Sequence, residues 1–395
     1  MLLKKATLLF ILILFFSFSI SLPALAVELK LVSEYEGGKL YKAGNLNVVV
    51  LRGTYREMGR QEGKLLKEQL AQMYKVAIEE TYVKEVGLKL EDINDTTRGI
   101  FAVYPKRFQD IIYGMAETSG LELDKLLALD QINVLPIISE TAVHCSAIVA
   151  WGEYTGGGPL VFGRNFDYPE YYEKFNPYLS VIVYQPEDAV PTAVVGYPGG
   201  VTAMHGLNKD GLFMELNDGA ASCGTASVDN RQMTLLYITS FLFDSSNITQ
   251  LDAALNSIRL GLAEIFTVAD KNTAFAYECS IDDTKKRMPD KDGLLVETNH
   301  FVNPAWNMEP TEGGETRSYT RYKNLIALGE KYKGKFNAQV MRQVLDTPIT
   351  LGGATRPNLA IQQLVVVPAE LKMWIKALGN PGWTELDLKP LFENK

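Results

Sequence analysis

Histidine and cysteine are scarce in this chain, which has three of each among 395 residues. None of them follows the C-x-x-C, H-x-x-x-H or H-E-x-x-H spacing of a zinc site. The chain also lacks the G-x-S-x-G elbow of serine hydrolases and the glycine-rich loops that hold phosphates or dinucleotides. We therefore expect neither a metal nor a cofactor.

An excess of positive charge is missing too. The formal net charge is −8, and no basic cluster follows the N-terminal region. Nucleic acid is therefore not expected as a partner, because such proteins need clustered lysine and arginine to neutralise phosphates. Hydrophobic residues make up 47% of the chain, which is ordinary for a globular protein with a sizeable core.

One long apolar run is present, at the N-terminus. Lys4 and Lys5 precede an almost wholly apolar stretch, residues 6–22, and residues 23–26 end in a small-x-small pattern. This predicts a signal peptide, residues 1–26, cleaved after Ala26, so that the mature protein is secreted or periplasmic. The run is nearly long enough to span a bilayer, so the alternative is an uncleaved anchor, the only expected contact with a membrane.

The cysteines are Cys145, Cys223 and Cys279. In an oxidising compartment two of them could pair and leave one over. Cys223 and Cys279 are the plausible pair, which would leave Cys145 free. An unpaired cysteine in an exported protein needs an explanation.

The predicted secondary structure changes character at residues 144/145. Residues 27–144 are predicted to be mainly helical after two edge strands near 29–32 and 46–51. The first helix opens with Thr54 as its N-cap and Glu57 in the capping-box position. Gly59 and Gly63 share one face of that helix, where another backbone could approach closely. Residues 145–395 alternate strand pairs with helices, which predicts a layered α+β domain in one compact unit.

A predicted hairpin places charged groups beside Cys145. Residues 145–152 and 160–166 read as strands around the glycines at 156–158. A simple antiparallel register puts the residue opposite Cys145 close to Tyr168, so that Arg164 and Asp167 lie near the thiol. A guanidinium near a thiol favours the reactive thiolate. The alternative interpretation is a buried structural cysteine and a surface ion pair.

Two mechanisms could activate this cysteine. His144 cannot help, because neighbours on a strand point to opposite faces. His300 and Asn303 follow at a spacing similar to papain-like proteases, although those enzymes place the cysteine at a helix N-terminus and this sequence predicts a strand. Alternatively, a cut before Cys145 creates an α-amine with an ordinary pKa of about 7.7–8.0, which can accept the thiol's proton.

The order of motifs resembles a known group of enzymes. Cys145-Ser146 with Phe162-Gly163-Arg164-Asn165-Phe166-Asp167-Tyr168-Pro169 looks like the N-terminal-nucleophile (Ntn) hydrolases related to choloylglycine hydrolase, penicillin V acylase, acyl-CoA:isopenicillin N acyltransferase and acid ceramidase. Four further segments are similar to motifs of that group in the same order: 53–63, 206–218, 297–301 and 318–322. Single motifs are weak signals, but five in order are a strong one.

The resemblance implies roles for individual residues. Cys145 would be the nucleophile, exposed by autocatalytic cleavage of the His144–Cys145 bond. Asp167 would orient the new α-amine and Arg164 would lower the thiol pKa. Asn299 and the Asn217 region would donate hydrogen bonds to the oxyanion. Arg321 would complete the charged cluster, and Asp218 would be a less secure participant through its carboxylate. Residues 217–219 also read as a turn, Asn299 as a strand-end turn residue and Arg321 as a solvated helix residue.

The resemblance also implies a fold and an activity. The expected fold is the four-layer αββα arrangement of Ntn hydrolases, with residues 27–144 as a pro-segment and residues 145–395 as the catalytic core. The expected activity is cleavage of a linear amide in a small acylated amine or amino acid through a thioester. Acyl transfer to an amine acceptor, a papain-like protease and an inactive secreted binding protein remain as alternatives.

Overall fold

The computed structural model describes residues 27–138, 144–223, 234–258, 260, 263–314, 317–380 and 382–393. The predicted signal peptide lies outside these residues, and so do residues 139–143, directly before His144. No helix within the described residues is long and apolar enough to cross a membrane.

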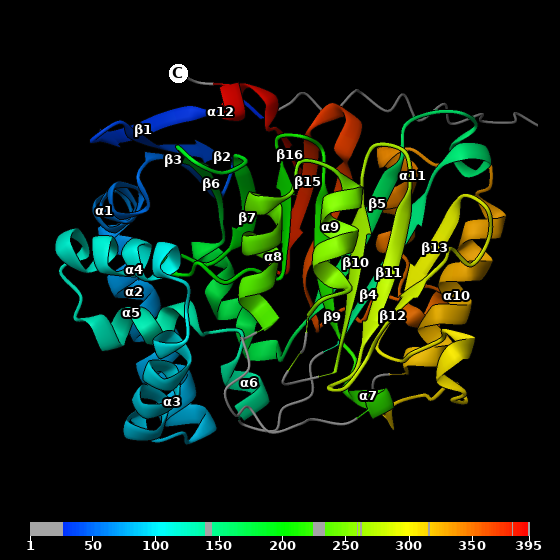
Figure 1. Ribbon diagram of the computed structural model, residues 1–395, viewed down its shortest axis with the longest axis horizontal. Helices are drawn as coiled ribbons and strands as arrows, with labels where there is room; N and C mark the ends of the chain where they lie inside the picture. Colours follow the sequence, from blue (N-terminus) through cyan, green and yellow to red (C-terminus); the bar gives the residue numbers. More distant parts are fainter. Residues whose placement is uncertain are drawn as a thin grey trace, which may run out of the picture.

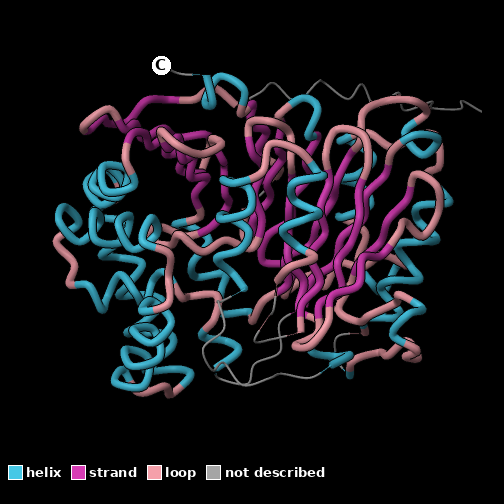
Figure 2. Tube along the Cα trace, in the orientation of Figure 1, coloured by secondary structure: helices cyan, strands magenta, loops and turns pink. Residues whose placement is uncertain are grey.

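Two sheets form the centre of the molecule (Figures 1 and 2). The larger has ten strands in the order β1-β2-β3-β6-β7-β8-β9-β10-β11-β12. Its strands are β1 (Lys30–Tyr35), β2 (Gly38–Ala43), β3 (Leu46–Gly53), β6 (Ser180–Pro186), β7 (Thr192–Gly196), β8 (His205–Asn208), β9 (Phe213–Asp218), β10 (Glu264–Ala269), β11 (Ala274–Cys279) and β12 (Thr284–Arg287). The smaller has six strands in the order β13-β4-β5-β14-β15-β16. These are β13 (Leu294–Glu297), β4 (His144–Ala150), β5 (Val161–Asp167), β14 (Ala360–Val367), β15 (Lys372–Ala377) and β16 (Thr384–Asp387).

The sheets pack face to face, because alternate residues of each strand are apolar and turn inward. Phe162 of β5 and Phe213 of β9 meet between the sheets, with ring centroids 4.6 Å apart. The outer face of the larger sheet is covered by α8 (Thr234–Asp244) and α9 (Ile248–Leu255), and that of the smaller sheet by α10 (Ser318–Lys331) and α11 (Ala338–Leu345). The expected four-layer αββα fold is confirmed.

The N-terminal segment contributes to this core and is not a separate layer. Its strand β3 pairs in parallel with β6, from Asn47 opposite Ser180 to Gly53 opposite Pro186. Its helices gather at one side of the molecule, blue to cyan in Figure 1. They are α1 (Tyr55–Leu65), α2 (Lys67–Met73), a π-helix (Tyr74–Val86), α3 (Leu90–Ala102), α4 (Lys106–Ser119) and α5 (Leu123–Asp130). The short α6 (Leu135–Ile138) lies apart from them (Figure 1).

Two local predictions for α1 are confirmed. The Thr54 hydroxyl accepts the Glu57 N–H, and the Glu57 carboxylate accepts the Thr54 N–H at 2.8 Å, which completes the capping box. The glycine face packs against α4, where a Cβ at Gly59 would lie 2.0 Å from the Ile111 carbonyl oxygen. Glycine is required there because the two helix backbones are in contact.

Other predictions needed correction. The strands β2 and β12 were not predicted, nor were β14, β15 and β16, because their patterns are short or almost continuously apolar. The hairpin register is displaced by two residues: Phe166, not Tyr168, lies opposite Cys145. The prediction centred the turn near the glycines at 156–158. The connection also contains a 3₁₀ turn, Gly152–Thr155, which changes the residues that lie opposite each other in the two strands. Short helices α7 (Ala220–Cys223) and α12 (Lys389–Glu393) complete the described elements.

Candidate active site

Cys145 is the second residue of β4, a central strand of the smaller sheet. Its side chain points between the two sheets and is buried, with 1% of its surface exposed. The cysteine therefore begins a strand and not a helix, which removes the arrangement that a papain-like protease would need. His300, the second residue of that alternative, bonds instead to Thr298 and Ser318.

Arg164 of β5 lies on the same inward face and contacts the thiol. Its Nη2 atom lies 3.4 Å from Cys145 Sγ. The same guanidinium donates to the backbone oxygens of Met204, directly before β8, and of Leu216 in β9 of the facing sheet. The predicted meeting of guanidinium and thiol is therefore present, and Arg164 also ties the two sheets together at this point.

Two further partners of Arg164 were not singled out from the sequence. Glu215 Oε2 lies 3.2 Å from Arg164 Nε, and His205 Nδ1 lies 2.9 Å from Arg164 Nη1. Burial and the nearby Arg164 lower the pKa of His205, so the ring is neutral and accepts this hydrogen bond. Strand parity could have found Glu215, because it precedes Asn217 by two positions and shares its face.

Asn299 and Arg321 hold the backbone of Cys145 from the other side. The Cys145 N–H donates to Asn299 Oδ1 at 3.1 Å, and Arg321 Nη1 donates to the Cys145 carbonyl oxygen at 2.7 Å. Arg321 Nη2 also donates to Asn299 Oδ1 at 2.6 Å. Arg321 belongs to the first turn of α10 and is fully buried, so it is not a solvated helix residue.

Asp167 lies opposite His144 in the β4–β5 register, on the outward face of the sheet. Its Oδ2 atom is 4.0 Å from Arg321 Nη1, and neither carboxylate oxygen accepts a hydrogen bond within the described part of the chain. Burial raises the pKa of Asp167 to about 6, against the lowering effect of Arg321, Arg356 and Arg164. The carboxylate thus flanks the predicted cleavage bond without touching the thiol.

Asn217 and Asp218 end β9 and contribute differently. Asn217 is fully buried, and both polar atoms of its side chain lack partners among the described residues. The Asp218 backbone oxygen accepts from Asn299 Nδ2 at 2.9 Å, whereas its carboxylate accepts the Ala220 N–H at 2.9 Å. Burial raises the pKa of Asp218 to about 6. Asp218 therefore reaches the site through its backbone, and the free amide of Asn217 remains available to a ligand.

The surroundings of the Cys145 sulfur favour the protonated thiol. Burial raises the pKa of Cys145 to about 11, and Arg164 only partly opposes this effect. Arg164 lowers the pKa of the thiol, as expected, but burial raises this pKa by more, so that it stays above its ordinary value. To react as a thiolate, this sulfur would need a proton acceptor close by; the backbone nitrogen of Cys145 itself is bound by Asn299 Oδ1.

The sequence left open a disulfide between Cys223 and Cys279, and Cys279 carries a free, buried thiol. The side chain of Cys223 lies outside the described residues. Among the described residues, no group of three or more histidine, cysteine, aspartate or glutamate side chains is placed to hold a metal ion.

Comparison with known proteins gives partial matches along the sequence. Protein dcd1B of Dictyostelium discoideum is 26% identical over 205 residues, which cover 45% of this chain and 40% of that protein. Protein dcd1A of the same organism is 24% identical over 291 residues, 63% of each. The chain thus spans less than two thirds of both curated relatives.

Solved structures resemble parts of the fold. An N-acylethanolamine-hydrolyzing acid amidase ortholog from Caenorhabditis elegans superposes with a TM-score of 0.44 at 20% identity, over 57% of this chain and 93% of that one. The conjugated bile acid hydrolase of Clostridium perfringens gives 0.45 at 13% identity, over 63% and 95%. Penicillin V acylase from Agrobacterium tumefaciens gives 0.40 at 12%, over 64% and 89%. Nothing about substrate follows from these partial superpositions.

A family model matches residues 154–349, described as acyl-coenzyme A:6-aminopenicillanic acid acyl-transferase. The matched segment begins after Cys145 and contains Arg164, Asp167, Asn217, Asn299 and Arg321. The resemblance read from the motifs is confirmed: the matched model describes the acyltransferase branch of the enzyme group that those motifs resemble.

Proposed function

We propose that this protein is an exported, self-processing N-terminal cysteine amidohydrolase that cleaves a linear amide in a small N-acyl amine or N-acyl amino acid. Self-cleavage would break the His144–Cys145 bond: Cys145 Sγ attacks the His144 carbonyl carbon, the chain shifts from nitrogen to sulfur, and water hydrolyses the resulting thioester. The cysteine then carries a free α-amine.

Turnover would follow the same path on the substrate. The α-amine takes the thiol proton as sulfur attacks the amide carbon, and that proton passes to the leaving amine when the carbon–nitrogen bond breaks. Water then attacks the thioester, which releases the acid and restores the thiol. The side-chain amide of Asn217, which is buried with no partner among the described residues, would donate to the oxyanion, and such a donor is worth about 2.7–4 kcal/mol of barrier.

One observation carries this proposal: three atoms of Cys145 are each held by a different buried group. Asn299 holds the nitrogen, Arg321 the carbonyl oxygen and Arg164 the sulfur. A structural cysteine has no need of a charged group at its sulfur, because burying charges is costly. The arrangement fits a residue whose nitrogen becomes a chain terminus.

Acyl transfer to an amine is the second candidate. The matched family is described by transfer of an acyl group to an amine, which forms the type of bond that the proposed hydrolase breaks. The two reactions share the thioester and differ in whether water or an amine attacks it. Offering an ordinary amine acceptor, such as glycine, with an N-acyl substrate separates them, because transfer yields a new N-acyl amine at the expense of free acid.

The test begins with processing. Denaturing gels and N-terminal sequencing should find a fragment that starts at Cys145 and, if the protein is exported, one that starts at Val27. Cys145→Ala should abolish both cleavage and turnover. Cys279→Ala is the matched control, because Cys279 is also a buried free thiol but lies outside the site, and it should retain both.

Substrate choice requires a panel that spans the open acyl classes: an N-fatty-acyl ethanolamine, an N-fatty-acyl glycine, a glycine-conjugated bile acid and phenoxymethylpenicillin. Release of free amine by the wild type but not by Cys145→Ala supports the proposal. An active enzyme that stays as one intact chain would contradict it. Failure of iodoacetamide to label Cys145 in processed protein would favour an inactive binding protein.

A further inference from the structure

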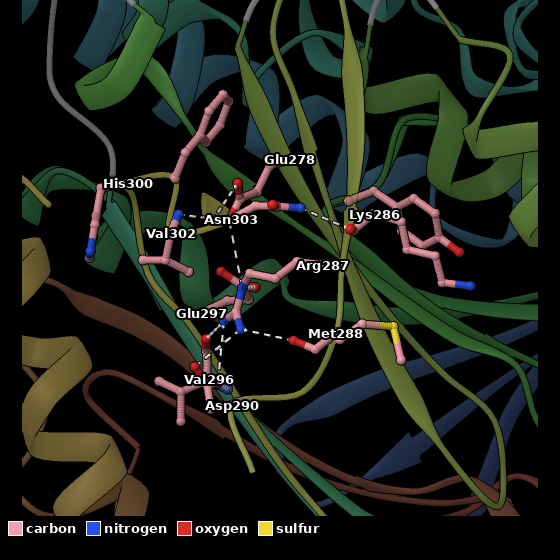
Figure 3. A network of polar contacts seen from close by, with 12 residues as sticks. Glu278, Lys286, Arg287, Met288, Asp290, Val296, Glu297, His300, Val302 and Asn303 are labelled. Atoms are coloured by element: carbon pink, nitrogen blue, oxygen red, sulfur yellow. Dashed lines mark hydrogen bonds and ion pairs between the residues drawn. The ribbon is translucent and has the colours of Figure 1, made fainter. Parts of the chain in front are cut away.

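A buried charged cluster lies in the seam between the sheets, beside the strand that leads to Asn299 (Figure 3). Arg287 of β12 is surrounded by Glu278, Glu297 and Asp290. The shortest distances from its guanidinium nitrogens are 2.8 Å to Glu297, 3.1 Å to Asp290 and 3.6 Å to Glu278. One cation thus faces three carboxylates, an arrangement that is costly unless further donors satisfy the anions.

Several hydrogen bonds of this cluster reach one short segment, residues 296–303, and others reach Met288 and Tyr322. Glu278 accepts the N–H groups of Val302 and Asn303 at 2.8 and 3.0 Å. Asp290 accepts the Val296 N–H at 2.7 Å, and Arg287 donates to the Val296 carbonyl oxygen. Figure 3 shows these contacts on both sides of the segment. The cluster therefore fixes the chain before and after Asn299.

Asn299 lies between these two anchored points. Its own N–H donates to Ser318 Oγ at 2.8 Å, which attaches it to α10. With this backbone position fixed, Asn299 Oδ1 accepts hydrogen bonds from both the Cys145 N–H and Arg321 Nη2. A displacement of residues 300–303 would move Asn299 away from Cys145, and a misplacement of about 1 Å can cost roughly 100-fold in rate.

We infer that Glu278 is a positioning residue for Asn299: its carboxylate fixes Val302 and Asn303, and Arg287 holds the carboxylate in place. This inference rests on the proposed function, because it assigns Asn299 the task of holding the nitrogen of Cys145. Glu278 acts at a distance and touches neither the thiol nor its nitrogen. Its effect is transmitted through the backbone of one loop.

Three substitutions test this role. Glu278→Ala removes both acceptors, and we expect kcat for the fastest amide of the panel to fall roughly 10- to 100-fold with KM nearly unchanged. Glu278→Gln keeps Oε1, which serves both N–H groups, and should stay within about threefold of the wild type. Asn303→Ala removes the bond from Asn303 Nδ2 to the Lys286 oxygen and should cost less than Glu278→Ala. This third variant keeps the test open if Glu278→Ala does not fold.

A matched control is available on the opposite face of the same strands. Asp252 pairs with Lys286, the neighbour of Arg287, at 2.7 Å, and has no contact with residues 296–303. Asp252→Asn should therefore leave kcat unchanged, even if it lowers the melting temperature. The pH profile of iodoacetamide labelling at Cys145 adds a second readout. Loss of Asn299 Oδ1, an acceptor that favours the protonated α-amine, should shift that profile to lower pH in Glu278→Ala only.

The outcomes separate the two hypotheses. If Cys145→Ala remains active, the proposed function fails whatever Glu278 does. If Cys145→Ala is inactive but the folded Glu278→Ala and Asn303→Ala enzymes match the wild type in kcat and labelling profile, only the positioning role is wrong. Equal losses in Glu278→Gln and Glu278→Ala would also overturn it, because they would indicate a need for charge and not for the loop position.

Discussion

The backbone nitrogen of Cys145 donates to the side-chain oxygen of Asn299 at 3.1 Å, across 154 residues of sequence. This contact joins the start of β4 to a residue just beyond the end of β13, its neighbour in the sheet. A side chain that bonds this nitrogen while it is part of a peptide is already placed to bind it as an amine. Processing and turnover can therefore share one geometry.

Replacing Arg164 by lysine should abolish most of the activity while keeping the charge. The guanidinium contacts the thiol, two backbone oxygens and His205 together, and one ammonium group cannot reach all of them. We expect a loss in turnover of about 100-fold or more, and slower labelling of Cys145 by iodoacetamide at each pH. Arg107→Lys is the control, since Arg107 forms a surface pair with Asp244. Wild-type labelling in the Arg164→Lys enzyme would contradict this role.

Asp167→Asn tests the carboxylate beside the cleavage bond. Burial raises the pKa of Asp167 to about 6, so its charge is present above this pH and lost below it. If the charge orients the α-amine, wild-type activity falls as the pH drops through about 6. The Asp167→Asn enzyme should be slow throughout and lack this step. The measurement is the pH dependence of kcat/KM.

Asp218→Asn provides the matched comparison for that profile. Its pKa is also raised to about 6 by burial, but its carboxylate accepts the Ala220 N–H. The step near pH 6 should therefore persist in Asp218→Asn. If the step is lost in Asp218→Asn but kept in Asp167→Asn, it arises from the titration of Asp218 and not of Asp167.

Strand alternation and motif order predicted many residues of this site, but not the contacts that join them across the two sheets. The hairpin placed Arg164 near Cys145 because both face the same side of neighbouring strands, and a register error of two residues does not change the face. Glu215 and His205 approach Arg164 from the other sheet. Strand parity could place Glu215 on the face of Asn217, but no local pattern reports that this face meets Arg164. The pairing of β3 with β6 was hidden for the same reason, since it joins segments far apart in sequence.

If the proposed cleavage of the His144–Cys145 bond occurs, the two fragments should stay together. Strand β3 of the first fragment pairs with β6 of the second along seven residues, and both lie inside one ten-stranded sheet. Gel filtration of processed protein should give one peak that contains both chains, which separate only in denaturant. Dissociation under native conditions would show that the sheet does not need its first three strands.

Gly59→Ala should destabilise the protein by about 1–3 kcal/mol, because added volume in a packed interface forces backbone shifts. The new Cβ would lie 2.0 Å from the Ile111 oxygen of α4. Gly99→Ala is the control: it lies in α3 with nothing within 4 Å of the new atom, and should stabilise by about 0.5–1 kcal/mol. Urea unfolding measures both, and similar midpoints would contradict the close helix contact.

A second buried carboxylate makes stability depend on pH. Glu62 of α1 accepts the Gly199 N–H at 3.0 Å, and burial raises its pKa from 4.5 to about 7. Because the folded state binds this proton more tightly, its contribution to stability is full below pH 4.5 and is lost as the pH rises through 7. Glu62→Gln mimics the protonated form, so it should be more stable than wild type at about pH 8, by up to about 3 kcal/mol.

The matched variant on the same helix should respond with the opposite sign. Hydrogen bonds from Thr54 lower the pKa of Glu57, so its charged form is the stabilising one. Glu57→Gln should therefore weaken the protein at about pH 8 and leave the pH dependence from Glu62 intact. Urea midpoints at about pH 5 and pH 8, measured in a Cys145→Ala background to keep the chain whole, decide between these signs. A Glu62→Gln protein less stable than its parent at the higher pH would mean that the charged carboxylate is compensated in the folded state.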